Sequence, residues 1–183
     1  VERDPDRFPD PARDLVDLAA YQARWREAHG RFTLNLAASR GCPYHCNWCA
    51  KPIWGQRYAL RHPERVVAEI AQVMRGSHPP EHLWFADDIF GLHPSWTVAF
   101  GAAMAAAGLR VPFQIQSRAD LITEEAAEAL AVAGCEEVWL GVESGDQAIL
   151  DAMEKGIRLD QVPPALERLR RRGMRVGFFL QFG

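Results

Sequence analysis

The sequence predicts an α/β fold, an open partial (β/α) barrel of parallel strands that stops at its fifth or sixth unit. Five short apolar runs recur along the chain, and a helix pattern follows each of the first four. Strands that alternate with helices are typical of a parallel sheet, whose right-handed crossovers wind the strands in one direction. A complete eight-unit barrel takes about 250 residues. The chain has 183 residues, so it holds only part of a barrel.

The strands are predicted from the apolar runs, and the helices from the signals at their ends. The five predicted strands cover residues 32–39, 82–86, 111–116, 137–142 and 175–182. Helices are predicted over 15–29, 63–75 and 95–107, and after three N-cap residues, Thr123, Asp146 and Asp160. A glycine stops each predicted helix; in chain order these are Gly30, Gly76, Gly108, Gly134, Gly156 and Gly173.

The chain is predicted to be one domain with a leading segment. Residues 1–30 form a linker and a first helix, because the stretch DPDRFPDPARD is rich in proline and charge and is typical of extended chain. Residues 31–183 form the core domain, which is long enough for one hydrophobic core and too short for two. The chain begins at Val1 and ends at Gly183, directly after an apolar run. We therefore expect it to be an excised piece of a longer protein.

Composition and charge exclude several classes of protein. The net charge of -3 and the pI of about 6.1 leave no surplus of positive charge to neutralise nucleic-acid phosphates. The densest basic run, at 168–172, is explained by its place in the last turn of a helix, where cations suit the dipole. No apolar run approaches the ~20 residues of a membrane span, and there is no secretory signal. The sequence therefore predicts a soluble intracellular chain that binds neither nucleic acid nor a membrane.

Three of the four cysteines lie within eight residues, as Cys42, Cys46 and Cys49 in a C-x3-C-x2-C pattern. A structural zinc site needs four ligands, usually in two separated pairs. His45 could supply the fourth, but four ligands from one eight-residue loop would strain a tetrahedral site. We therefore interpret His45 as a solvated loop residue. Cys135 enters the fourth strand at its amino end, on the opposite rim, and is interpreted as a small core residue.

An iron–sulfur cluster suits the three-cysteine loop better than zinc does. Closely spaced thiolates are the usual ligands of such clusters. Three thiolates on a four-iron cluster leave one iron open, and an open iron can bind a substrate or a cofactor. The count of three therefore favours chemistry at the cluster over simple electron storage.

Polar side chains follow every predicted strand at its carboxyl end, which is where sites form in parallel α/β sheets. They are Ser39, Arg40 and Gly41 after the first strand, Asp87 and Asp88 after the second, Gln116, Ser117 and Arg118 at the third, Glu143, Ser144 and Gly145 at the fourth, and Gln181 at the fifth. Any single one of them, such as Asp88 or Ser117, could merely cap the next turn. Together, beside the thiol cluster, they indicate one shared site.

The cysteine loop and the strand ends resemble those of the radical S-adenosylmethionine (radical SAM) superfamily. The similar stretches are SRGCPYHCNWC, WFADDIF, QSRADLI, AGCEEVWLGVESGDQAILDAMEKG and GFFLQFG. They are most similar to the subgroup that has an upstream cobalamin-binding domain and includes anaerobic magnesium-protoporphyrin ester cyclase relatives. The resemblance covers nearly the whole chain and implies a partial barrel, in agreement with the periodicity.

The resemblance implies a role for each motif residue. Cys42, Cys46 and Cys49 would hold a 4Fe–4S cluster whose open iron chelates the amino and carboxylate groups of S-adenosylmethionine. Trp48 would lie beside the adenine. Glu143 would accept hydrogen bonds from the ribose hydroxyls.

Two further cofactor contacts are implied, and one of them departs from the usual pattern of the superfamily. Ala86, Asp87 and Asp88 stand where the superfamily often has Gly-Gly-Glu, which lines the methionyl amino group, and which aspartate takes that role is left open. Arg118 would pair with the methionyl carboxylate through both arms of its guanidinium.

The rest of the predicted cofactor site belongs to the Arg118 motif and to the last motif of the chain. Gln116 and Ser117 precede Arg118 at the third strand end, and Gln181 belongs to the last motif. A surface ion pair of Arg118 with Asp120 is the alternative interpretation of that arginine.

The implied reaction starts with one electron from the reduced cluster, which splits S-adenosylmethionine into methionine and a 5′-deoxyadenosyl radical that takes hydrogen from an unreactive carbon. The substrate would be a small molecule. The electron would come from an external donor of the flavodoxin or ferredoxin type, in a reducing, low-oxygen cytoplasm. If a cobalamin domain precedes Val1, the subgroup implies methyl transfer or ring formation.

Several alternatives remain open at the level of sequence. One is a radical SAM enzyme without cobalamin, such as an RNA methylthiotransferase. Others are an iron–sulfur electron carrier without catalytic activity and a zinc-binding module. Four aromatic side chains near the strands could wall the pocket, although core packing alone explains them: Trp84, Phe85, Phe90 and Trp139.

Overall fold

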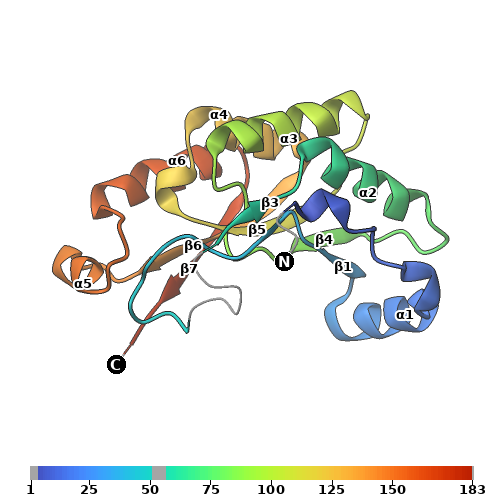
Figure 1. Ribbon diagram of the computed structural model, residues 1–183, viewed down its shortest axis with the longest axis horizontal. Coiled ribbons are helices and arrows are strands. Elements are labelled where there is room, and N and C mark those ends of the chain that lie inside the picture. The colour runs from blue at the N-terminus through green and yellow to red at the C-terminus, as the bar shows by residue number, and fades with distance from the viewer. Residues whose placement is uncertain (1–3, 51–56, 183) are drawn as a thin grey trace.

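The computed structural model describes residues 4–50 and 57–182 of the chain. Five parallel strands form one sheet in the order β1-β4-β5-β6-β7 (Figure 1). The strands are β1 (Thr33–Leu36), β4 (His82–Phe85), β5 (Phe113–Ser117), β6 (Cys135–Glu143) and β7 (Arg175–Leu180). Each parallel crossover carries a helix, so the predicted α/β class and partial barrel are confirmed.

The main helices form an arc over one face of this sheet (Figure 1). They are α2 (Pro63–Arg75), α3 (Pro94–Ala106), α4 (Glu124–Ala133) and α6 (Val162–Arg171). Two further helices, α1 (Leu18–His29) and α5 (Gln147–Ala152), lie at opposite sides of the domain. Four 3-10 turns complete the helical elements within residues 4–50 and 57–182: Pro5–Arg7, Arg13–Leu15, Ala119–Leu121 and Leu159–Gln161. Among the described residues, no helix is long and apolar enough to span a membrane.

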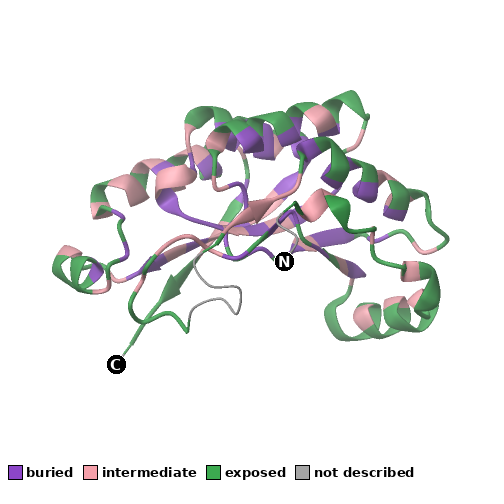
Figure 2. Cartoon of the chain, in the orientation of Figure 1, coloured by how far each residue is buried: buried purple, intermediate pink, exposed green. Residues whose placement is uncertain are grey.

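The hydrophobic core lies between the sheet and the four helices of the arc, which bury the sides that face the strands (Figure 2). Phe85 on β4 packs edge-on against Phe90, Phe100 and Phe113, with ring centroids 4.8 to 5.9 Å apart. Such aromatic contacts add to the stabilisation from buried area. Phe85 and Phe90 are therefore core residues.

The first predicted strand, 32–39, is interrupted in the structure. β1 ends at Leu36, and β2 (Ser39–Arg40) pairs with β3 (Ala59–Leu60) in a separate antiparallel sheet. The reason is a buried carboxylate: Asp87 accepts hydrogen bonds from the Ala38 N–H, at 3.1 Å, and from the Ser39 hydroxyl. These bonds turn the chain away from the parallel ladder. The two-residue β3 is too short to produce a periodic pattern, so it was not predicted.

Helix ends follow the predicted signals at most positions. Gly30 and Gly134 adopt the left-handed conformation after α1 and α4, with φ of 76° and 103°. The Thr123 hydroxyl accepts a hydrogen bond from the Ala126 N–H, at 3.1 Å, so Thr123 caps α4 as predicted.

Two predicted helix ends near α5 and α6 are wrong. Asp146 caps α5 as expected, but the helix ends at Ala152, before Gly156. Asp160 caps no helix, because its carboxylate pairs with Arg158 inside the 3-10 turn Leu159–Gln161. Gln161 is the N-cap of α6 instead.

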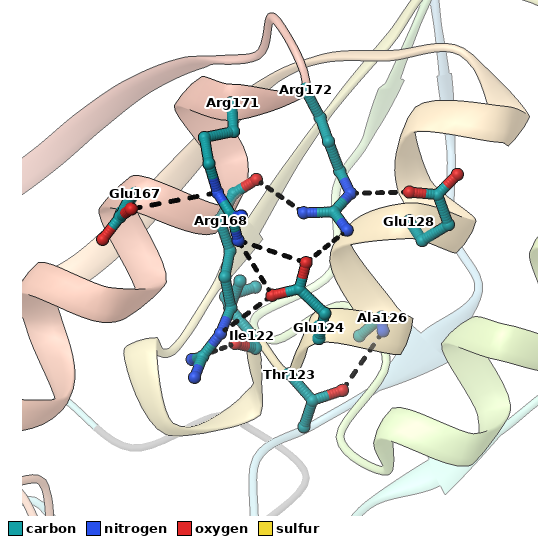
Figure 3. Close-up of polar contacts among 9 residues, drawn as sticks. All are labelled: Ile122, Thr123, Glu124, Ala126, Glu128, Glu167, Arg168, Arg171 and Arg172. Carbon is teal, nitrogen blue, oxygen red and sulfur yellow. Dashed lines mark hydrogen bonds and ion pairs between the residues drawn. The ribbon is translucent and has the colours of Figure 1, made fainter.

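The basic run at 168–172 closes α6, as predicted, and three of its arginines face α4 (Figure 3). Glu124 accepts hydrogen bonds from Arg171, at 3.1 Å, and from Arg172, at 2.6 Å, and Arg172 also binds Glu128. The hydrogen bond from Arg172 lowers the pKa of Glu124. The positive charge of this run is therefore paired with acidic side chains of the neighbouring helix.

The leading segment packs against the domain instead of extending away from it. Arg13 and Arg61 both bind the carboxylate of Glu69 on α2, at 2.5 Å each, and Arg61 also binds Asp10 at 3.3 Å. Glu69 is only 2% exposed. Residues 4–17 thus contain two 3-10 turns held by ion pairs, and the expectation of an extended linker is wrong for them. The domain boundary at residue 31 stays a prediction.

We expect Glu69→Gln to lower the free energy of unfolding by about 1.5–3 kcal/mol, because the amide cannot keep two charge-assisted hydrogen bonds. Urea unfolding measures the change. Glu64→Gln is the matched control, since Glu64 is an exposed residue on the same helix. Equal effects of the two substitutions would contradict a structural role for the ion pairs of Glu69.

Candidate active site

A cavity of about 620 Å³ opens at the carboxyl ends of the strands. Its lining includes the three loop cysteines and side chains from the ends of β5, β6 and β7. Of the residues predicted to hold the cluster or contact the cofactor, all but Ala86 and Asp87 line it: Cys42, Cys46, Trp48, Cys49, Asp88, Gln116, Ser117, Arg118, Glu143 and Gln181. The other strand-end residues of the predicted shared site, Ser39, Arg40, Gly41, Ser144 and Gly145, do not line it. The structure therefore brings together the cysteine loop and the strand ends, as expected for strands that run in the same direction.

The cysteine loop begins at Gly41, where only glycine fits. Its φ is 84°, and a Cβ at this position would collide with the carbonyl oxygen of Arg57. Further along, the Asn47 side chain donates to the Ala152 carbonyl at 2.6 Å, and its backbone N–H donates to Met153 at 3.0 Å. The loop is thus attached to the end of α5.

The three loop thiols share the cavity without converging on one point. Cys42 and Cys46 are half-buried and Cys49 is exposed. Burial raises the pKa of the Cys42 thiol. Among the described residues, no group of three or more histidine, cysteine or acidic side chains lies close enough together to hold a metal ion. The loop therefore offers three free thiols to one space, and a cluster would have to draw them together.

Cys135 and His45, the two other side chains considered as metal ligands, lie outside the cavity. Cys135 is buried at the amino end of β6, where burial raises the pKa of its thiol. It belongs to the hydrophobic core, as predicted. His45 is exposed and is absent from the cavity lining, which agrees with a solvated loop residue.

Of the two neighbouring aspartates, Asp88 lines the cavity and Asp87 does not. Asp87 is 2% exposed and is turned toward Ala38 and Ser39, and burial raises its pKa to about 6. Ala86 lines a different cavity, beneath the leading segment. Asp88, and not Asp87, is therefore the aspartate that faces the cavity.

Arg118 is 3% exposed, and its guanidinium is already engaged. Nε and Nη2 bind the two carboxylate oxygens of Asp120 at 3.0 and 3.2 Å. Nη1 and Nη2 donate to the carbonyls of Lys155 and Gly156 at 2.9 and 3.1 Å. The group also lies 3.7 Å from the ring centroid of Tyr44. Asp120 occupies the two arms of the guanidinium that the predicted contact with a cofactor would use. The ion pair of the alternative interpretation is present, but it does not lie at the surface, because the side chain of Arg118 is 4% exposed and that of Asp120 21%.

Glu143 and Lys155 form a buried ion pair at the cavity wall, with 2.9 Å between Lys155 Nζ and Glu143 Oε1. Glu143 has a φ of 67°, which is rare for a residue with a side chain. It lies where the β6–β7 register is irregular, and its carbonyl accepts from the Gln181 N–H at 2.9 Å. Lys155 Nζ also lies 5.7 Å from the ring centroid of Trp48.

Sequence reasoning missed Lys155 and Tyr44 as lining residues. Lys155 follows α5 and is no strand-end residue. It reaches the cavity because Glu154 and Gly156 on either side of it both have positive φ, of 53° and 66°. The glycine in the MEKG stretch was a weak signal for such a turn.

Comparison with known proteins assigns the family. A profile of the radical SAM superfamily matches residues 36–182. The chain belongs to the radical SAM superfamily. The predicted resemblance is confirmed, and the cavity at the strand ends lies within the matched part of this radical SAM chain.

Curated relatives of this radical SAM chain are about a quarter identical to it. An uncharacterised methyltransferase of Pyrococcus horikoshii is 28% identical over 92% of this chain and 36% of its own length. The hopanoid C-3 methylase of Methylococcus capsulatus is 27% identical over 93% of this chain and 32% of its own length. The anaerobic magnesium-protoporphyrin IX monomethyl ester cyclase of a Synechocystis strain is 26% identical over 87% of this chain and 34% of its own length. The chain spans about a third of the length of these relatives.

Solved structures of radical SAM enzymes share the fold. The methyltransferase TsrM from Kitasatospora setae, with cobalamin and a [4Fe–4S] cluster bound, superimposes with a TM-score of 0.75 at 21% identity. That match covers 97% of this chain and 34% of TsrM. The cobalamin-dependent enzyme OxsB, with S-adenosylmethionine bound, superimposes with a TM-score of 0.71 at 20% identity. That match covers 81% of this chain and 23% of OxsB.

Proposed function

We propose that this chain is the catalytic core of an enzyme that holds a 4Fe–4S cluster on Cys42, Cys46 and Cys49 and binds S-adenosylmethionine in the same cavity. The observation that carries the proposal is one cavity lined by three free thiols and by the polar ends of three strands. The donor set fits, because thiolates are the usual cluster ligands and no fourth cysteine or histidine lines the cavity within the described residues. Together these cofactors supply a 5′-deoxyadenosyl radical for C–H activation.

The cavity residues would bind and orient the cofactor. Glu143 Oε1 accepts from Lys155, which leaves Oε2 for the ribose hydroxyls. Trp48 is 43% exposed, and its ring would lie beside the adenine. Asp88 would receive the methionyl amino group. Arg118 would offer the methionyl carboxylate a single N–H, on Nη1, because its other four N–H groups are engaged.

The reaction we propose is methyl transfer or ring formation on a small molecule, with cobalamin held outside this chain. This rests on the names of the relatives, which are methyltransferases, methylases and cyclases. The electron would come from a flavodoxin or ferredoxin, in a low-oxygen cytoplasm. RNA modification is less well supported, because three arginines of the densest basic run are paired with acidic side chains of α4 or its own helix, as seen in Figure 3.

Anaerobic reconstitution with iron and sulfide tests the proposed function. The loaded protein should show a thiolate-to-iron absorption band that changes when S-adenosylmethionine is added. Under dithionite it should then form 5′-deoxyadenosine and methionine. A cluster that neither responds to S-adenosylmethionine nor cleaves it would identify an electron carrier instead.

We expect Glu143→Ala to weaken S-adenosylmethionine binding roughly tenfold to a hundredfold, the effect of one lost charge-assisted hydrogen bond. The iron content should stay normal, because Glu143 is not a predicted cluster ligand. Titration of the reconstituted protein measures the affinity. Glu136→Ala is the matched control, since Glu136 lies at the other end of the same strand. Unchanged affinity would remove Glu143 from the site.

We expect Arg118→Lys to fold and keep its cluster, but to lose about 1–2 kcal/mol of unfolding free energy, because an ammonium cannot replace the two carbonyl contacts and the fork. Cleavage of S-adenosylmethionine should slow, since the Lys155 turn loses its support. Arg158→Lys is the matched control, because Arg158 forms the same pair with a residue two positions on, at the surface. Wild-type stability and cleavage in Arg118→Lys would leave this arginine without a role.

A further inference from the structure

The cysteine loop is held in place by the residues between its cysteines. Three of these spacer residues, Tyr44, Asn47 and Trp48, all contact one neighbouring part of the chain. That part, which we call the dock, consists of Arg118 and residues 152–156. It joins the end of β5 to the turn after α5. The anchoring of the loop is therefore separate from its thiols, which stay free.

The Tyr44 contact depends on the fixed orientation of Arg118. Two hydrogen bonds to Asp120 and two to the carbonyls of Lys155 and Gly156 hold the guanidinium in one plane. Its Cζ lies 3.7 Å from the ring centroid of Tyr44, within the ~6 Å range of a cation–π contact. Arg118 is 3% exposed, and such a contact is strongest when the cation is shielded from water. The edge of the guanidinium is thus occupied by hydrogen bonds, and one of its faces is covered by the loop.

Two further contacts hold the second half of the loop. The Asn47 side chain donates to the Ala152 carbonyl at 2.6 Å, and its backbone N–H donates to the Met153 carbonyl at 3.0 Å. Lys155 Nζ lies 5.7 Å from the ring centroid of Trp48. Each of the two spacers in the C-x3-C-x2-C pattern therefore has its own anchor on the dock.

An ordered loop lowers the free-energy cost of binding a cluster. A flexible loop loses conformational freedom when a metal centre gathers its thiolates, and that loss weakens the binding. The dock orders both spacers without any metal. Less of the ordering cost is then left for the cluster to offset.

We infer that the dock preorganises the cysteine loop for the cluster, and that Tyr44 is the positioning residue that connects Arg118 to the spacer between Cys42 and Cys46. Arg118 then serves the loop as well as the cofactor. The link to the cluster rests on the proposed function, whereas the anchoring of the loop needs no cofactor.

Hydrogen exchange of the full chain, reduced and free of cluster, measures the anchoring directly. The Asn47 amide reports on it, because its N–H bonds to the Met153 carbonyl and exchanges when the loop opens. Tyr44→Leu should speed this exchange roughly tenfold or more, through loss of a shielded cation–π contact. Tyr44→Phe should exchange like the wild type, because the contact uses the ring and not the hydroxyl. Tyr21→Leu removes an exposed ring from α1 and should change nothing.

Iron release measures the consequence for the cluster. After anaerobic reconstitution, iron should pass to a chelator roughly tenfold faster from Tyr44→Leu than from the wild type. It should also pass faster from Asn47→Ala, which keeps the ring contact but loses the bond to Ala152. The urea midpoint of both variants should stay near that of the wild type, because Tyr44 is only half-buried and Asn47 is exposed.

Three results would overturn the inference: Asn47 exchange that is unchanged in Tyr44→Leu, exchange that is equally fast in Tyr44→Phe, or a fall in the urea midpoint that accounts for the faster exchange. S-adenosylmethionine cleavage is measured separately. Exchange in the expected order without cleavage would reject the proposed function alone. Cleavage by a chain whose Asn47 exchange does not depend on Tyr44 would reject this inference alone.

Discussion

Replacing Cys42, Cys46 or Cys49 with alanine will abolish stable cluster binding, whereas Cys135→Ala will take up iron normally. The three loop thiols line one cavity, and Cys135 is buried in the core at the opposite ends of the strands. Two thiolates leave a four-iron cluster under-ligated and open to solvent. Iron and sulfide per chain, counted after anaerobic reconstitution, measure the effect, and the expected loss in each loop variant is complete.

Two controls separate the cluster from other metal sites. His45→Ala should retain the cluster, because this side chain is exposed and outside the cavity lining. Zinc should not restore a loop variant. A cluster that survives in any loop variant but is lost in Cys135→Ala would reverse the ligand assignment.

Much of the fold was predictable because its signals are local. Apolar runs of four or more residues and glycines with positive φ, such as Gly30 and Gly134, marked strands and helix ends directly. These local patterns gave a wrong strand end where a side chain distant in the sequence determines where the strand stops. Asp87, nearly fifty residues along the chain, interrupts the first strand through its bonds to Ala38 and Ser39. No pattern within 32–39 reports that contact.

The candidate site was predictable to the extent that strand ends supply it. Parallel strands carry their last residues to one rim, so Gln116, Glu143 and Gln181 were found from position alone. Lys155 comes from a turn that folds back after α5. The engagement of Arg118 depends on carbonyls of that same turn. Such contacts are set by tertiary structure, and residue spacing does not reveal them.

The turn after α5 supports three parts of the site at once. Its carbonyls at 155 and 156 bind Arg118, and the Lys155 ammonium binds Glu143. The preceding end of α5 holds the cysteine loop through Asn47. A change in this turn therefore affects the thiols and the cofactor-binding side chains together.

Lys155→Met will lower the free energy of unfolding by about 3–5 kcal/mol, the usual effect of leaving one charge of a buried pair without its partner. Glu143 is 5% exposed, so its carboxylate cannot recover hydration from solvent. Its positive φ adds strain that only surrounding contacts maintain. Methionine keeps the length of the lysine stem, so packing changes little. Urea unfolding of the chain measures the loss.

The double variant Glu143→Gln with Lys155→Met identifies the cause. Removal of both charges should recover much of the loss, because no uncompensated charge then stays buried. A double-mutant cycle with the two single variants isolates the coupling between the side chains. Arg24→Met is the surface control: its pair with Glu27 is exposed, so the substitution should change stability little. If the changes in unfolding free energy of the two single variants simply add up in the double variant, Glu143 and Lys155 do not stabilise each other. The ion pair would then not be what stabilises this wall of the cavity.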